Sequence, residues 1–368
     1  MNSFNTQKPR PHETRTEYHM ADWPTDWTQT DDTYALVNPP KPKQSIFKKL
    51  LRHVLRFWYL YLLLIIVGTL AIILPIIYVV YPNTAQSQVD SSTIIPTHQS
   101  ITKVTPTSFY YNQSALLEIS TSYNPPPQLF TWNGSYYVEG STEPFLSIVI
   151  PQIAAQNGSE IQTAQEIQIT NMPEFIKNND LIFNSDNFSI YLRGNGQLKE
   201  SILSTININY DKKISLRGFN KLQDVQVTDF RILTETLSDG SNAAGNVSVA
   251  NPTIFELYMG NVTFDISVNG STIANATLPN FTLASGTNTY PLHVTSNETR
   301  VLELLKLPAY RCGVLPVTVQ GKESIVDGQV IPYFTAPLQA NRFTTTTNLT
   351  SALQAIGFGD LVNGTCET

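Results

Sequence analysis

The stretch Val262–Thr277, which reads VTFDISVNGSTIANAT, decides the fold of the second half of the chain. Apolar and polar residues alternate on both sides of Asn269-Gly270, and a period of two is typical of strands with one solvated face. Asn and Gly both accept the positive φ angles of a two-residue type I′ turn. The stretch therefore predicts an antiparallel β-hairpin, with Val262 and Val268 on the same face.

Short runs of the same kind fill most of the chain after residue 100, and Asn, Gly and Pro separate them. Such spacing favours antiparallel sandwiches over alternating strands and helices. Helical patterns are few: Ser159–Ile167 begins with a capping box, and Pro173–Lys177 could form one turn. We expect a mainly β protein with two tandem antiparallel β-sandwich domains, 101–220 and 221–335, and a C-terminal segment, 336–368, packed on the second domain.

One apolar segment stands apart from these strands. Phe57–Tyr81 holds 25 residues without a charge, and at ~1.5 Å per residue a helix of this length covers about 37 Å, more than the ~30 Å of a bilayer core. A cleaved signal peptide has a shorter apolar region near the start of the chain. The segment therefore predicts a single transmembrane helix, residues 57–81, that serves as an uncleaved signal anchor and is followed by a neck, residues 82–100.

The flanks of the apolar segment predict its orientation. Residues 1–56 carry nine basic and six acidic side chains, whereas the remainder carries 14 and 23, and basic flanks stay cytoplasmic. All Asn-x-Ser/Thr acceptor sites for N-glycosylation lie after the segment, as luminal acceptors must. These twelve sites are Asn112, Asn133, Asn157, Asn187, Asn246, Asn261, Asn269, Asn275, Asn280, Asn297, Asn348 and Asn363. We expect a type II glycoprotein with a cytoplasmic N-terminus.

Residues 1–56 are predicted to form a disordered cytoplasmic tail that ends in a basic juxtamembrane segment. The cations of that segment can rest on anionic lipids of the cytoplasmic leaflet or act only as a topology signal; they are Lys48, Lys49, Arg52 and Arg56. Tyr34 and Val37, within Tyr-Ala-Leu-Val, match the tyrosine-plus-apolar pattern of an adaptor-recognised sorting signal.

The segment from Asn251-Pro252 to Asn288 resembles a known domain. Its order is Asn-Pro, a strand, Gly260-Asn261-Val262-Thr263-Phe264, a hairpin, and a strand that ends at Gly286 before Asn288. This order resembles the late-embryogenesis-abundant type 2 domain, a fibronectin-like β-sandwich. With one span and a basic tail, the chain is similar to a fungal family of vacuolar-membrane proteins that carry this domain in tandem. The resemblance implies a vacuole membrane; plasma membrane and endoplasmic reticulum share the topology.

No catalytic motif appears in the sequence. The region after the span has two histidines about 200 residues apart, and Gly194-Asn195-Gly196 reads as a turn rather than a phosphate loop. Paired acids such as Glu139 and Glu143 are common in any chain of this size. We therefore expect no enzyme activity and no cofactor or metal. The net charge of −6 also argues against a nucleic-acid partner.

Cys312 and Cys366, the two cysteines, lie on the side predicted to be oxidising. One intrachain disulfide is the simplest reading, and an intermolecular bond is the alternative. The function expected from all these features is structural or interactive, with an unknown luminal protein or lipid partner. The open apolar run Phe145–Ile153 is the expected binding surface. A lipid-binding or lipid-transfer module is the first alternative, and a glycan-acting hydrolase is the second.

Overall fold

The computed structural model describes residues 46–120, 124–201, 203–222, 225–362 and 365. The chain divides into two compact units, Met1–Ile65 and Ile66–Thr368. The predicted sorting residues Tyr34 and Val37, the acceptor Asn363 and the half-cystine Cys366 lie outside the described residues.

The first unit contains the basic segment, which forms helix α1 (Ile46–Arg56). The four basic side chains of this helix, Lys48, Lys49, Arg52 and Arg56, are exposed to solvent.

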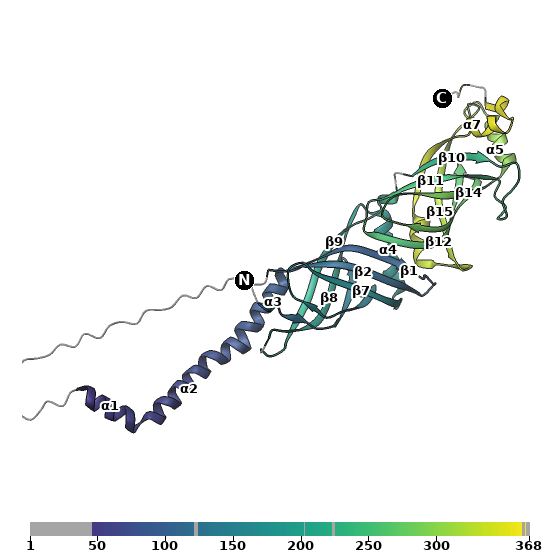
Figure 1. Ribbon diagram of the computed structural model, residues 1–368. Coiled ribbons are helices and arrows are strands. Elements are labelled where there is room, and N and C mark those ends of the chain that lie inside the picture. The colour runs from purple at the N-terminus through teal and green to yellow at the C-terminus, as the bar shows by residue number, and fades with distance from the viewer. Residues whose placement is uncertain (1–45, 121–123, 202, 223–224, 363–364, 366–368) are drawn as a thin grey trace, which may run out of the picture. The chain divides into compact units, whose positions relative to one another are not determined.

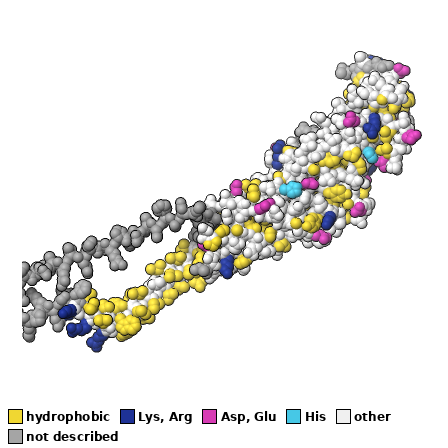
Figure 2. Space-filling view, viewed as in Figure 1, with side chains coloured by type: hydrophobic (Ala, Val, Ile, Leu, Met, Phe, Trp, Pro, Cys, Tyr) yellow, Lys and Arg dark blue, Asp and Glu magenta, His cyan; other side chains and the backbone are white. Residues whose placement is uncertain are grey.

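The predicted apolar helix is present and is longer than expected. It runs as α2 (Trp58–Pro75), a π-helical stretch η1 (Ile76–Val80) and α3 (Tyr81–Ser91). Among the described residues it is the one helix long and apolar enough to cross a membrane, and apolar side chains cover its surface in Figure 2. Pro75 does not end the helix, because the backbone widens into the π-helical stretch after it.

The segment 82–100, which the sequence presents as a neck, is folded. It contains most of α3 and of strand β1 (Thr93–Thr102). Tyr81, Ala85 and Val89 are spaced by four, so they share one face of α3, and all three are buried. That face packs on strand β9 (Ile206–Arg217).

The strands form two sheets (Figure 1). The larger sheet has the order β10-β11-β14-β13-β12-β1-β2-β7. Strand β15 pairs with the later residues of β12, on the same edge as β1, and β16 and β17 pair with β15. Besides β1, its strands are β2 (Ser108–Glu118), β7 (Ser159–Gln168), β10 (Gln226–Ile232), β11 (Ala243–Asn251), β12 (Phe255–Val268), β13 (Ser271–Leu283), β14 (Gly286–Ser296), β15 (Val314–Val326), β16 (Gln329–Val330) and β17 (Arg342–Asn348).

The smaller sheet belongs to the first half of the chain. Strand β8 lies at its centre, with β9 along one edge and β4-β5 and β3-β6 along the other. Besides β9, its strands are β3 (Gln128–Leu129), β4 (Trp132–Val138), β5 (Leu146–Ile150), β6 (Ile153–Ala154) and β8 (Asn187–Lys199). This sheet packs its apolar face against β1, β2 and β7, and the predicted mainly β sandwich fold is confirmed.

Two sequence predictions about helices are wrong or incomplete. Ser159–Ile167 is not a helix: it is strand β7, which pairs with β2 over ten residue pairs. Ile161, Thr163 and Ile167 are buried, so the period-two pattern prevails over the capping-box signal. The turn expected at 173–177 is the start of α4 (Met172–Asn184), which Asn171 caps through a bond from the Glu174 amide at 3.3 Å.

Four more short helices complete the second half of the chain. None of them is longer than nine residues. They are α5 (Glu298–Leu305), α6 (Pro332–Ala340), α7 (Thr350–Ala355) and the 3₁₀ turn η3 (Gly359–Val362); another 3₁₀ turn, η2 (Asn220–Leu222), precedes β10.

The predicted hairpin is confirmed in detail. Val268 pairs with Ser271 across Asn269-Gly270, whose φ angles are +48° and +76°. Gly260 lies at a bulge with φ +66°, and a Cβ there would be 2.3 Å from the Ile325 carbonyl oxygen, so both a positive φ and a close approach require glycine.

Strand β1 joins the two halves of the chain into one sheet. It pairs in parallel with β12, from Gln99 opposite Phe255 to Ile101 opposite Leu257, among ladders that are otherwise antiparallel in the described residues. The fully buried Tyr333 of α6 adds to the junction, because its hydroxyl donates to the Thr105 carbonyl oxygen at 2.9 Å.

Candidate functional site

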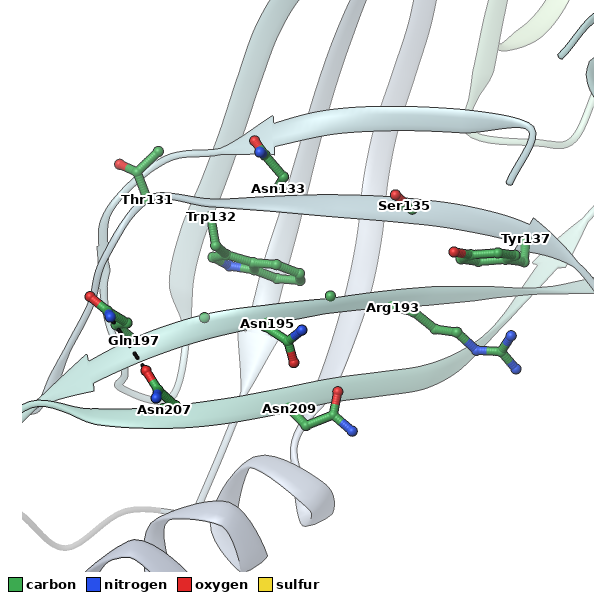
Figure 3. A pocket seen from close by; sticks show the side chains of 12 residues that line it. Thr131, Trp132, Asn133, Ser135, Tyr137, Arg193, Asn195, Gln197, Asn207 and Asn209 are labelled. Carbon is green, nitrogen blue, oxygen red and sulfur yellow. Dashed lines mark hydrogen bonds between the residues drawn. The ribbon is translucent and has the colours of Figure 1, made fainter. Parts of the chain in front are cut away.

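A broad polar groove lies on the outer face of the smaller sheet, across β4, β8 and β9 (Figure 3). Its cavity volume is about 740 Å³, within the ~300–1,000 Å³ typical of small-ligand sites. The lining residues are Thr131, Trp132, Asn133, Ser135 and Tyr137 from the β4 segment, Arg193, Gly194, Asn195, Gly196 and Gln197 from β8, and Asn207 and Asn209 from β9. We call this feature the polar groove.

Strand alternation builds the polar groove. On β4, Trp132, Tyr136 and Val138 point into the core, which places the intervening polar residues on the outer face. The same alternation on β8 and β9 sets polar side chains directly opposite one another. Asn195 faces Asn209, and Gln197 faces Asn207 with a bond of 3.3 Å from Nε2 to Oδ1.

Close packing beneath the polar groove requires Gly194 of β8. A Cβ on Gly194 would lie 2.5 Å from the Trp132 ring and 2.5 Å from the Asn133 carbonyl oxygen. The Trp132 ring fills that space and packs on Tyr210 at 5.3 Å. The prediction of a turn at Gly194-Asn195-Gly196 is therefore wrong, because these residues lie inside a strand that bends closely over an indole ring.

Arg193 occupies one end of the polar groove and is already paired. Its Nε donates to Asp211 at 3.1 Å, and its guanidinium carbon lies 5.0 Å from the ring centres of both Tyr137 and Tyr191. Both partners of the ion pair are about half exposed, so the pair fixes the geometry of the side chains more than it stabilises the fold. The guanidinium charge is thus balanced, and the remaining lining is neutral.

The lining of the polar groove offers mainly neutral hydrogen-bonding groups. Its amides and hydroxyls both donate and accept hydrogen bonds, which matches a neutral polyhydroxyl or acetamido group. The lining residues include no carboxylate, histidine, cysteine or lysine, and the described part of the chain contains no cluster of metal ligands.

Tyrosines near the polar groove are held in the neutral form. Burial raises the pKa of Tyr136 to about 12, against a smaller opposing effect of its bond to Gln113. Burial also raises the pKa of Tyr210. Phenols with raised pKa values do not act as bases near neutral pH, so they serve packing and hydrogen bonding.

Helix α3 holds the β9 wall of the polar groove. The Gln86 side chain makes two bonds to the backbone of Asn209, from Nε2 to the carbonyl oxygen at 2.7 Å and to Oε1 from the amide at 2.9 Å. Lys212 donates to the Asp90 carbonyl oxygen at the next turn of α3, and burial of the ammonium lowers the pKa of Lys212. The helix that continues the apolar segment thus supports the strand that forms one wall of the polar groove.

The predicted glycosylation residues lie mostly on the surface. Ten of the eleven described acceptor asparagines are exposed; Asn246, which donates to Asp229 at 3.1 Å, is half-buried. Asn133 is the acceptor that lines the polar groove. No carbohydrate is part of the structure, so occupancy of the sites stays a prediction.

Other predicted site residues have different outcomes. Cys312 is not a free thiol, but its predicted partner lies outside the described residues, so the pairing stays a prediction. Glu139 is paired with Lys213 at 2.6 Å rather than with a second acid.

The expectation of an open apolar surface at Phe145–Ile153 is wrong. Phe145, Leu146, Ile148 and Ile150 are buried, and Val149 is the large apolar side chain that remains exposed. The reason is the same alternation, which turns the apolar residues of β5 toward the core.

A small cavity lies in the core of the first half, bordered by α4 and the buried pair Tyr111 and Tyr136. Its volume is about 40 Å³, which is room for very few waters and none for an acyl chain.

Comparisons with known proteins identify two regions. Residues 246–341 match the family described as late embryogenesis abundant protein, which covers β11 through α6 and confirms the type 2 resemblance for the second half. Residues 143–266 match a family described as protein of unknown function (DUF3712). Neither match reaches half of the chain. Neither match shows that the late-embryogenesis-abundant domain occurs twice in this chain, or that the chain belongs to a fungal vacuolar family.

A search of curated proteins finds no match to this chain. Among solved structures, the partial N-terminal region of enterococcal surface protein is similar over 69% of this chain and 93% of that chain, at 10% identity and a TM-score of 0.15. Likeness at that level carries no argument about fold or function.

Proposed function

We propose that this protein is a non-enzymatic, single-pass type II membrane glycoprotein that holds tandem β-sandwich domains against the luminal face of a membrane. The observation that carries the proposal is the continuation of the apolar helix into α3, whose buried face packs on β9. A domain joined to its span by a packed helix, rather than by a flexible linker, stays close to the bilayer. Its role is then structural or interactive at that surface.

The charge and acceptor distribution supports the orientation. Helix α1 presents Lys48, Lys49, Arg52 and Arg56 beside the start of the apolar segment, where anionic lipids of the cytoplasmic leaflet attract them by about 1 kcal/mol each. The exposed acceptor asparagines all follow the span. In this arrangement the oxidising lumen also permits the bond between Cys312 and Cys366, which a shift in mobility on reducing gels would reveal.

The lining of the polar groove supports the proposal that the first half of the chain binds a neutral polar ligand. The ligand of the groove carries hydroxyl or amide groups, because the lining offers neutral donors and acceptors and no charged reactive pair. The lipid-transfer alternative has less support, since the apolar cavity in the core of the first half is about 40 Å³.

A vacuole membrane is the proposed location, on the strength of the resemblance to fungal vacuolar-membrane proteins and of Tyr34 and Val37. Imaging of the full chain with a fluorescent protein on its N-terminus tests it against the plasma membrane and the endoplasmic reticulum. Exclusive signal at either of the other two membranes would overturn the vacuolar assignment and leave the topology standing.

Protease protection of sealed microsomes tests the topology. Protease added outside should remove an N-terminal tag and leave a protected fragment that contains the β-sandwiches, and detergent should abolish the protection. Digestion of the sandwiches in sealed vesicles, with the tag intact, contradicts the proposal.

A further inference from the structure

Of the acceptor asparagines, Asn133 has a distinct setting. It belongs to Asn133-Gly134-Ser135 on β4, and its side chain lines the polar groove (Figure 3). None of the other described acceptors lines that groove. A glycan attached at this position begins at the lining of an open groove whose volume is about 740 Å³.

The geometry points to the N-linked glycan of Asn133 as the occupant of the polar groove: we propose that its first sugars lie across β8 and β9. This inference rests on the proposed luminal orientation, because only luminal asparagines receive such glycans. It assigns the neutral polar ligand of the groove to a modification of the chain itself.

The chemistry of the groove fits sugars. Asn195 and Asn209 face each other across β8 and β9, and Gln197 and Asn207 form the next pair. Each amide offers a carbonyl oxygen and an NH₂ group, which can accept from and donate to sugar hydroxyls and acetamido groups. The lining lacks unbalanced charge, since Arg193 is paired with Asp211. A neutral ligand can therefore bind without burying an unpaired charge.

Covalent attachment to Asn133 allows weak contacts to hold the glycan in the groove. A free sugar has to overcome the loss of translational and rotational freedom on binding. A glycan attached beside the groove has an effective concentration in the mM range, so contacts too weak to capture a free oligosaccharide can hold an attached one.

Strand β4 holds the acceptor Asn133 in a fixed position. A Cβ on Gly134 would lie 2.8 Å from Leu192 Cδ1 and 2.9 Å from Ile150 Cδ1, so glycine keeps β4 tightly packed beneath the acceptor. The Ser135 hydroxyl lies 3.0 Å from that of Ser147 on β5, on the side away from β8. The backbone at the acceptor is therefore rigid, and β8 and β9, on the other side of β4, carry the polar side chains that line the groove.

Site-resolved deglycosylation of the native full chain tests the inference. The protein, purified in detergent from eukaryotic cells, is treated with a peptide N-glycosidase without denaturation, and each acceptor peptide is followed by mass spectrometry. We expect the glycan on Asn133 to be released about tenfold more slowly than those on Asn157 and Asn275, the protection that a preference of about 1.4 kcal/mol for the bound position gives. Denatured protein should lose all of them alike.

Two variants separate contact with the groove from mere crowding at the attachment point. Asn195→Ala combined with Asn209→Ala should bring release at Asn133 to the rate at Asn157. The control Gln162→Ala, which removes an exposed amide on β7, should leave the protection unchanged.

The outcomes separate this inference from the proposed function. The inference is overturned if Asn133 carries no glycan, or if its glycan is released as fast as the glycan of Asn157 in the unsubstituted protein. Glycans on other acceptors would still support the luminal orientation in either case. Protection that survives the double substitution also overturns the inference. Absence of glycans at every acceptor overturns the proposed function itself.

Discussion

Replacement of Tyr333 with alanine should destabilise both halves of the chain at once. The side chain is fully buried at the junction, 5.2 Å from the Phe175 ring and 6.1 Å from the Phe109 ring, between ring centres. Loss of a buried aromatic ring costs about 3–5 kcal/mol, and loss of the hydrogen bond to the Thr105 carbonyl oxygen adds about 1 kcal/mol. The total is on the order of 4–6 kcal/mol.

The conservative variant Tyr333→Phe isolates the hydroxyl. It keeps the ring contacts and leaves the Thr105 carbonyl oxygen without this donor, so we expect a loss of about 1–2 kcal/mol. The matched control is Tyr290→Phe. The Tyr290 hydroxyl donates to the Thr282 carbonyl oxygen at 2.6 Å within the second half, so that change should act on the second half alone.

Hydrogen exchange followed by mass spectrometry on the full chain provides the assay, because it reports the stability of each segment separately. Tyr333→Ala should speed amide exchange in β2 of the first half and in β15 of the second by a similar factor. Acceleration in β15 with β2 unchanged would refute the idea that Tyr333 couples the two halves.

Three further changes test other parts of the structure. Gly260→Ala should cost several kcal/mol, since strain at φ +66° alone costs about 1–3 kcal/mol and the new Cβ would collide with β15; a midpoint in urea within error of the unsubstituted protein would contradict this. Gln86→Ala should remove both bonds from α3 to β9 and raise amide exchange in α3 by about tenfold or more, with β2 unaffected. Asp239, whose pKa is lowered to about 2 chiefly by its hydrogen bond to His293, should contribute stability above about pH 4 that is lost as the pH falls through about 2. Asp239→Asn should therefore be less stable than the unsubstituted protein at pH 5, and the difference should be much smaller at pH 2, as measured by urea unfolding.

The parts of the fold that depend on local sequence could be predicted. The hairpin at Asn269-Gly270 follows from two residues that accept positive φ angles and from alternation on both sides. The apolar helix follows from length and composition, although its continuation through α3 does not, because only three spaced apolar residues signal that Tyr81, Ala85 and Val89 are buried.

The parts that depend on pairing between distant segments could not be predicted. Ser159–Ile167 carries a helix-start signal, and only its ten pairs with β2 make it a strand. The parallel contact between β1 and β12 joins residues about 155 positions apart, and no local pattern specifies it.

The polar groove was missed because its residues come from three separate strands. Asn133, Asn195 and Asn209 are unremarkable one at a time, and sequence gives no register between β4, β8 and β9. One signal was available: Gly194 and Gly196 stand within an alternating run, and glycines inside a strand often mark a close approach to another group.

Asp31→Asn tests the orientation of the chain most directly, because it creates an acceptor, Asn-Asp-Thr, at residues 31–33 in the tail expected to be cytoplasmic. Glycopeptide mass spectrometry of the full-length variant made in eukaryotic cells compares the new acceptor with Asn157. The expected result is an unmodified peptide at residue 31 and a glycan at Asn157. A glycan at residue 31 with Asn157 bare would mean that the chain crosses the membrane in the opposite direction.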